Sequence, residues 1–227
     1  MSDLPVYIPI CFALISLVTV WLLFRAAQRS AILLVIVGSW MVLQTILSLN
    51  HIYTKPSRIP LFPLLALPPL LFIIFLMTSA SGKRFADSLD PGWLTALHII
   101  RVPVECLLLA LAFQKTIPIL MTFEGWNADI LSGLLAILVY FLVFVQKKNY
   151  PKLLLAFNFI GILLLLNIVV IAILSIPSPF QKLGFNQPNR AVLYFPFVWL
   201  PSVIVPIVLF SHLVMIRRLT MGNQNKI

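Results

Sequence analysis

The stretch of sequence from 153 to 175 reads LLLAFNFIGILLLLNIVVIAILS and contains no charged side chain in 23 residues. At a rise of about 1.5 Å per residue, about 20 apolar residues cross a hydrocarbon core about 30 Å thick. Backbone N–H and C=O groups find no partners in lipid, so an apolar stretch of this length must satisfy them internally, as a helix does. The stretch therefore predicts a transmembrane helix.

Six other apolar stretches have a comparable length and character. The composition, 61% hydrophobic and only 10% charged, excludes a water-soluble globular domain, and a β-barrel would need shorter, alternating segments. Because the loops are short and no internal repeat is visible, we predict one all-α membrane domain over residues 1–227, a polytopic bundle of seven transmembrane helices. The predicted spans are 5–24, 31–49, 60–79, 93–113, 130–145, 153–175 and 191–216.

The basic residues predict how these spans are oriented. The chain has 16 Lys and Arg residues against six Asp and Glu residues, a formal net charge of +10. Cytoplasmic loops retain an excess of Lys and Arg, and the larger group of cations falls on the inner side if the N-terminus is outside and the C-terminus is cytoplasmic. The inner cations are then Arg25, Arg29, Lys83, Arg84, Lys147, Lys148, Lys152, Arg217, Arg218 and Lys226, and the outer ones are Lys55, Arg58, Lys115, Lys182 and Arg190.

With this placement, most of the positive net charge serves to orient the chain in the membrane and to contact lipid headgroups. Nucleic-acid binding is not expected, because no basic stripe interleaved with aromatic residues lies on a soluble face. We expect an integral protein of the plasma (inner) membrane, with membrane lipids and a small-molecule or ion ligand as partners. The sequence leaves the oligomeric state open.

The fourth stretch places three ionisable side chains inside a membrane helix. Residues 93–106 read WLTALHIIRVPVEC, and at 100° per residue His98, Arg101 and Glu105 share one face. An arginine at mid-span costs at least about 2.5–3.5 kcal/mol on insertion scales, so this face should point into the bundle. Glu105, four residues after Arg101, is the expected partner of that arginine.

Two interpretations of this buried site remain open. In the first, an ion pair of Arg101 and Glu105 fixes the packing of helices, and His98 bonds to a neighbouring helix. In the second, Arg101 holds an anionic ligand group while Glu105 or His98 exchanges a proton. The pattern indicates a buried polar site, but it does not decide between these two roles.

His212, in the seventh stretch, lies at a depth similar to that of His98, so the two imidazoles are placed to meet. Two histidines plus a carboxylate suffice for zinc or iron, and two facing histidines can ligate a haem. However, the chain has neither His-Glu-x-x-His nor Cys-x-x-Cys spacing. No cofactor is therefore predicted, and His98 with His212 is kept as the metal or haem alternative.

Polar residues outside the fourth stretch are further candidates for ligand binding. The loop 121–130 reads MTFEGWNADI and gathers Glu124, Asn127 and Asp129. Asn127 or Asp129 can cap the following helix, and the alternative is a loop that folds over a cavity above Glu105. Gln44, in the outer half of the second stretch, is the candidate from a second helix.

Three classes of function remain. Rhodopsins also have seven helices, but the last stretch lacks a lysine for a Schiff base, which excludes retinal. The first class, which we favour, is a protein that binds or transports a small anionic or proton-coupled ligand. The second is a membrane-embedded, lipid-directed enzyme, either metal-dependent or without a metal. The third is a structural or accessory membrane subunit with a buried stabilising pair.

Overall fold

The computed structural model describes residues 4–55 and 61–221, and the described chain is all-α. Two short stretches of π-helix, η3 (Phe141–Val145) and η5 (Leu200–Ile204), extend neighbouring α-helices, and η1 (His98–Ile100) joins α5 to α6. The α-helices are α1 (Tyr7–Ala26), α2 (Ala31–Leu49), α3 (Pro63–Thr78), α4 (Ala80–Ser88), α5 (Pro91–Leu97), α6 (Arg101–Phe113), α7 (Asp129–Tyr140), α8 (Pro151–Ser175) and α9 (Val205–Thr220).

Five helical segments are long and apolar enough to cross a membrane. A sixth crossing results if α3 and α4, which meet at an angle of 91°, count as one span. The segment Asp129–Val145 is apolar but shorter. The chain is thus a multi-pass membrane protein, as predicted. The five spans are α1, α2, Pro91–Phe113, α8 and Leu200–Thr220.

Short polar residues determine where several helices begin. The side chain of Ser30 accepts the amide of Leu33 at the start of α2, and that of Asp90 accepts the amide of Trp93 at 2.9 Å at the start of α5. Such side chains replace partners that the first amides of a helix lack. Ser79 does the same for α4, so the chain can turn sharply there and start a new helix.

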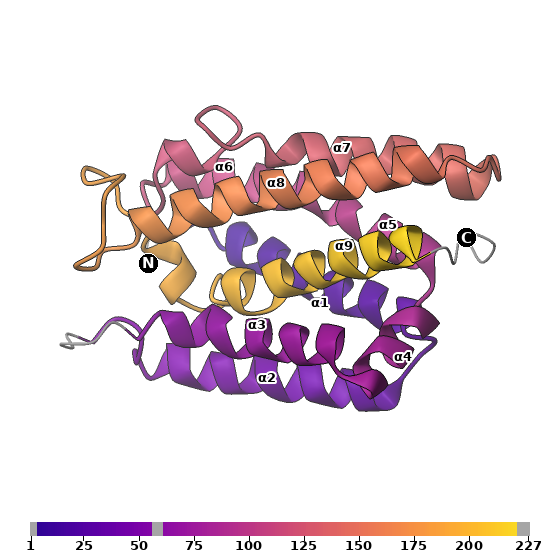
Figure 1. Cartoon of the computed structure of the whole chain (residues 1–227). Helices are drawn as coiled ribbons and strands as arrows, with labels where there is room; N and C mark the ends of the chain where they lie inside the picture. Colours follow the sequence, from indigo (N-terminus) through magenta and orange to yellow (C-terminus); the bar gives the residue numbers. More distant parts are fainter. Residues whose placement is uncertain (1–3, 56–60, 222–227) are drawn as a thin grey trace.

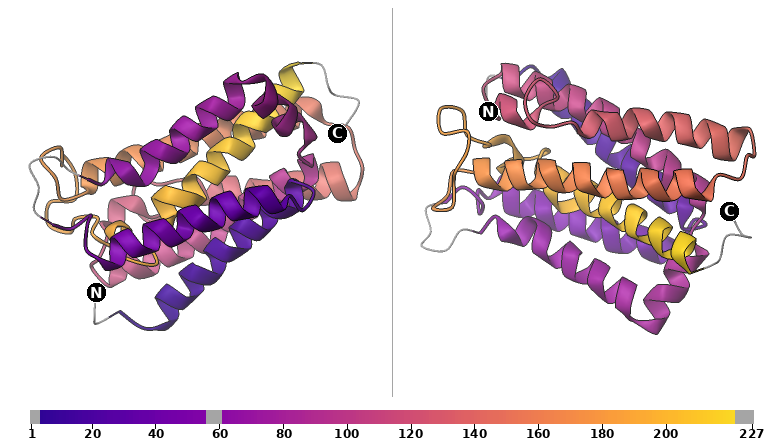
Figure 2. Two further views of the ribbon diagram at one scale, coloured as in Figure 1. Left: turned by 90° about the horizontal axis from the view of Figure 1, so that it is seen from below. Right: turned by 45° about the horizontal axis from the view of Figure 1, so that its top comes forward.

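The helices lie side by side in one elongated bundle (Figures 1 and 2). In Figure 1, α2 and α3 form one flank, α6, α7 and α8 form the other, and α9 passes between them. The turns after α1, α4 and α7 lie at one end of the bundle, and the loops after α2, α6 and α8 lie at the other. The first and last described residues are at opposite ends.

The predicted boundaries of the last span need correction. We predicted a helix over 191–216, but residues 191–199 form a 3-10 turn, η4 (Ala191–Leu193), followed by irregular backbone, and the long helix starts only at η5. Pro196 lacks the amide hydrogen that a helix interior requires, whereas Pro201 lies in the first turn of η5, where that hydrogen has no partner within the helix. Three residues used in the predictions, Arg58, Pro60 and Lys226, lie outside the described residues.

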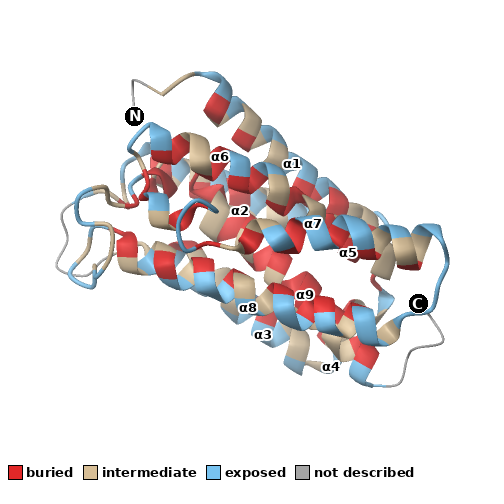
Figure 3. Ribbon diagram, turned by 90° about the horizontal axis from the view of Figure 1, so that it is seen from above, coloured by how far each residue is buried: buried red, intermediate tan, exposed pale blue. Residues whose placement is uncertain are grey.

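Burial follows the pattern of a protein surrounded by lipid. Large apolar side chains are exposed on the outer faces of helices, for example Ile32 (75% exposed), Val35 (65%) and Leu163 (67%). Polar side chains such as His98, Asn158 and His212 are completely buried. Figure 3 shows buried and exposed residues alternating along the helices, so that each presents one face to the interior. The polar groups of the spans are therefore gathered inside the bundle.

Candidate functional site

Arg101 lies at the start of α6, is 3% exposed, and is the centre of a hydrogen-bond network between four helices. Its Nε donates a hydrogen bond to Asp129 Oδ2 at 2.7 Å, and its Nη2 donates one to Asp129 Oδ1. Nη1 donates to Ser132 Oγ at 2.6 Å and to His212 Nε2 at 3.0 Å, and Nη2 also donates to the carbonyl of Gly161 at 3.1 Å. A guanidinium has five N–H donors. All five are therefore used within the protein.

The predicted partner of Arg101 was wrong. The ion pair forms with Asp129, the first residue of α7, and not with Glu105. Asp129 and Ser132 are three residues apart, so they lie on the same face of α7 and both reach the guanidinium. Spacing along one helix favoured Glu105, but a carboxylate from a second helix meets the fork of the guanidinium with both oxygens.

Glu105, one turn further along α6, is bound by the loop that precedes α7. Both of its carboxylate oxygens lie 2.7 Å from Asn127 Nδ2, and the side chain is 1% exposed. Asn127 Nδ2 also donates to the carbonyl of Met121, and Asn127 Oδ1 accepts the amide of Asp129 at 2.9 Å. The side chain of Asn127 thus accepts the amide of the first residue of α7, although the N-cap residue itself is Ala128. Its Nδ2 closes the loop over Glu105.

His212 connects the network to α8. Because Arg101 can only donate, Nε2 of His212 is the acceptor and the proton is on Nδ1, which donates to Asn158 Oδ1 at 2.8 Å. Asn158 Nδ2 in turn donates to the carbonyl of Leu154. Both ring nitrogens of His212 are therefore occupied.

His98 meets His212, as the sequence predicted. The two rings are stacked, with centroids 3.8 Å apart and planes 15° apart. Stacked rings direct their in-plane nitrogen lone pairs side by side, so they do not converge on one ion and leave no room for a haem between them. Among the described residues no group of three His, Cys, Asp or Glu side chains is arranged to hold a metal. Neither ring nitrogen of His98 has a hydrogen-bond partner in the part of the chain that the structure describes.

A cavity of about 350 Å³ lies beside the network, between α3, α6, α8 and the η5–α9 segment. Its lining is almost entirely apolar, with side chains such as Leu65, Leu165 and Ile204, but Arg101, Glu105 and Asp129 form part of the wall. Asn189 also lines it: Nδ2 donates to the carbonyl of Ala172, and Oδ1 is buried with no partner among the described residues. Ligand cavities are typically about 300–1,000 Å³, mainly apolar, with a few polar groups.

Two predicted site residues lie elsewhere. Gln44 is buried in α2 and its Oε1 accepts a hydrogen bond from Tyr53 at 2.6 Å, away from the Arg101 network. Burial raises the pKa of Tyr53 to about 12. Glu124 is exposed at the surface of its loop. These two residues are not brought to the cavity.

Four residues of the site were not singled out from the sequence as ligand-binding candidates: Ser132, Asn158, Gly161 and Asn189. Asn158 was visible as a polar residue in an apolar helix, which usually marks an interhelical hydrogen bond. Gly161 permits the close approach of α8, because a Cβ at this position would overlap the imidazole of His212. A single serine, glycine or loop asparagine carries no comparable signal.

These features define an all-α, multi-pass membrane protein with a buried Arg/Asp/Glu/His network beside an apolar cavity. Residues 59–220 match the family described as Domain of unknown function (DUF8737). Because this match covers more than half of the chain, the protein belongs to that family. No curated protein and no solved structure matches the chain.

Proposed function

We propose that the protein binds a small amphipathic amine in the cavity beside α6 and exchanges it for a proton at Glu105. The observation that carries this proposal is the distribution of hydrogen-bonding groups on the cavity wall. Arg101 has no donor left for an anion, whereas Glu105 and Asn189 Oδ1 present acceptors. A ligand with an apolar body and a donor-bearing cationic head matches this wall.

The exchange follows from the cost of a buried carboxylate. Arg101 and Asp129 neutralise one another, while the described partner of Glu105 is the neutral amide of Asn127. A buried charge without a counter-charge is unfavourable by several kcal/mol or more, as an order of magnitude. Glu105 is therefore occupied by a proton or by a ligand ammonium, but not by both. This coupling favours the proton-coupled interpretation over the anionic one.

We place the cavity within a seven-span arrangement, with the N-terminus outside and the C-terminus in the cytoplasm, in the plasma (inner) membrane. The first and last described residues lie at opposite ends of the bundle, which suits an odd number of crossings (Figure 1). A separate polar hollow of about 370 Å³ at the end bearing the loops after α2 and α8 shares Phe62 and Ile176 with the cavity. In this orientation the hollow provides the route from outside.

Three probes of equal chain length test the headgroup: hexylamine, hexanol and hexanoate, titrated by calorimetry into the protein in lipid nanodiscs at pH 7. We expect hexylamine to bind most tightly. Because hexylamine is already protonated at this pH, the proton displaced from Glu105 should appear as a difference in binding enthalpy between phosphate and Tris buffers.

Glu105→Gln should abolish both hexylamine binding and proton release, whereas Glu124→Gln, a change of an exposed acid on the adjacent loop, should preserve them. Leu165→Trp should fill the cavity and exclude all three probes. Tighter binding of hexanoate, or unchanged hexylamine binding in Glu105→Gln, would overturn the proposal.

A second candidate function, a structural membrane subunit, is favoured by one specific observation. The guanidinium of Arg101 ties α6 to α7, α8 and α9 with every donor used, which is what a purely stabilising group would do. If none of the three probes binds to a protein that remains folded, this candidate replaces the first.

A further inference from the structure

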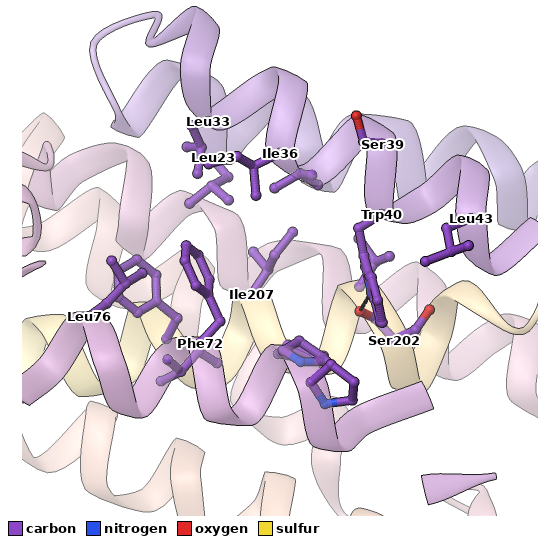
Figure 4. A pocket seen from close by; sticks show the side chains of 17 residues that line it. Leu23, Leu33, Ile36, Ser39, Trp40, Leu43, Phe72, Leu76, Ser202 and Ile207 are labelled. Atoms are coloured by element: carbon purple, nitrogen blue, oxygen red, sulfur yellow. Dashed lines mark hydrogen bonds between the residues drawn. The ribbon is translucent and has the colours of Figure 1, made fainter. Parts of the chain in front are cut away.

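A second hollow, which we call the crevice, has a volume of about 370 Å³ and separates α2 from α3, with η5 and α9 as its floor (Figure 4). It shares no lining residue with the cavity beside Arg101. Several residues on its rim are exposed, including Ile36 (45%), Leu43 (44%) and Phe72 (39%). The crevice therefore opens to the surface of the bundle that faces lipid.

The walls of the crevice are apolar and fixed. Trp40 Nε1 donates to the carbonyl of Ser202 at 2.9 Å, which holds the indole against η5, and Figure 4 shows this side chain standing between α2 and α3. On the other side Pro68 and Pro69 contribute rings that have no amide donor. Apart from Ser39 and Ser202, the lining consists of apolar side chains that offer contact to a hydrocarbon chain.

The length of the crevice matches one leaflet. Its lining on α2 runs from Leu33 to Leu43, which are ten positions apart, or about 15 Å along a helix. This is half of a hydrocarbon core about 30 Å thick. Leu33 and Leu76 mark its end near the turns after α1 and α4. An acyl chain of a single leaflet therefore fits along it.

Basic residues lie directly beyond that end. Helix α4 turns by 91° from α3 and packs so closely that a Cβ on Gly82 would overlap the backbone of Leu76. Lys83 and Arg84 follow Gly82, and Arg84 is exposed, with Nη2 3.2 Å from Ser81 Oγ. Neither side chain lines the crevice, but both belong to α4, the helix that follows the α3 end of the crevice at Leu76. Two cations placed there are complementary to a phosphate group on an acyl chain.

We propose that the crevice is a binding site for an anionic phospholipid, with one acyl chain between α2 and α3 and its phosphate headgroup on Lys83 and Arg84. The proposal does not depend on an amine ligand. A cation near the membrane surface contributes about 1 kcal/mol to the attraction of anionic lipid, so each of the two basic residues is expected to contribute a factor of about five.

The test is a titration of delipidated protein in detergent with phosphatidylglycerol or phosphatidylcholine of identical acyl chains, followed by native mass spectrometry. We expect one phosphatidylglycerol to bind at least about fivefold more tightly than phosphatidylcholine. Lys83→Gln with Arg84→Gln should abolish this preference. Lys147→Gln with Lys148→Gln removes the same charge at the same end of the bundle, away from the crevice, and should preserve it.

Blocking the crevice provides an independent measurement. Val37→Phe fills a lining position of α2, and Val35→Phe makes the same change two residues away on its exposed face. We expect only Val37→Phe to displace the bound lipid, with both variants melting at temperatures close to that of the parent. Equal binding of the two lipids, or equal lipid retention by the two phenylalanine variants, would overturn the proposal.

Discussion

Arg101 shows how one residue can make a charge tolerable inside a membrane. Placing arginine at mid-span costs at least about 2.5–3.5 kcal/mol on insertion scales. Here Asp129 supplies the opposite charge and Ser132, Gly161 and His212 supply the remaining acceptors. Because every donor is matched, the charge is fixed in place. The groups that remain open, Glu105 and Asn189, lie on the cavity wall instead.

The two stacked histidines should differ sharply in their effect on stability. His212 bonds to Arg101 and Asn158 through its two nitrogens, whereas neither nitrogen of His98 has a partner among the described residues. Leaving a buried donor or acceptor unmatched costs about 1–3 kcal/mol. We expect His212→Leu to lower the free energy of unfolding by at least about this amount, and His98→Leu to change it by less than about 1 kcal/mol. Equilibrium unfolding in mixed micelles measures both, and equal losses would contradict the assigned hydrogen bonds.

Tyr53 provides a pH-dependent prediction outside the spans. Its pKa is raised from 10 to about 12 because the phenol is buried, and its hydroxyl donates a hydrogen bond to Gln44 Oε1. A raised folded-state pKa means that the stabilising contribution is complete below pH 10 and is lost as the pH rises toward 12. Absorbance at 295 nm should show one of the five tyrosines ionising near pH 12. Tyr53→Phe should remove this step, whereas Tyr7→Phe, at an exposed position, should leave it. A step that survives in Tyr53→Phe would refute the assignment.

At the scale of elements, Gly161 determines how closely α8 approaches α9. A Cβ at Gly161 would overlap the ring of His212, whereas one at Gly38 in α2 would meet nothing within 4 Å. Overpacking a core typically costs about 1–3 kcal/mol, so Gly161→Ala should destabilise the protein by about this amount. Gly38→Ala should be neutral or stabilising by about 0.5–1 kcal/mol, since alanine favours a helix. Thermal unfolding of the two variants checks the difference, and equal melting temperatures would mean that α8 and α9 are not in close contact at Gly161.

The elements themselves were largely predictable, because apolar length alone decides where a chain can be helical in lipid. The predicted span 31–49 has the same bounds as α2. The predicted last span begins at residue 191, nine residues before η5 begins. There the apolar composition continues through Pro196 while the backbone cannot be helical. The predicted end of the third span at residue 79 falls at the bend, but the short polar helix α4 that Ser79 caps was not predicted, because apolar length does not signal it.

The site was predictable in its location but not in its pairing. Periodicity placed His98, Arg101 and Glu105 on one buried face, and all three are buried. Which carboxylate reaches Arg101 depends on how α7 packs against α6, and no pattern within one helix encodes this. The same limitation applies to Gln44, whose depth suggested the site although its partner is Tyr53.

At the scale of the whole molecule, the distribution of cations predicts the orientation. In the described residues, nine Lys and Arg residues lie at or beside the end bearing the turns after α1, α4 and α7, against four at the other end, once Lys226 and Arg58 are set aside. From the positive-inside rule we expect the first end to lie in the cytoplasm. The proposed lipid site agrees with this placement. Its two basic residues, Lys83 and Arg84, belong to the same end of the bundle, and anionic lipids are concentrated in the cytoplasmic leaflet.

Cysteine labelling in intact cells tests this orientation directly. In a background of Cys11→Ala with Cys106→Ala, we expect Glu124→Cys to react with a membrane-impermeant maleimide added outside. Lys148→Cys, at the opposite end of the bundle, should react only after the membrane is permeabilised, and reaction of both variants after lysis controls for accessibility. The reverse pattern would place the Lys83–Arg84 pair outside and direct the polar hollow near α8 toward the cytoplasm. Labelling of both sites from outside would mean that the chain crosses the membrane an even number of times between them. Since α7 is the one span between these two positions, that result would identify this short helix as the segment that fails to cross.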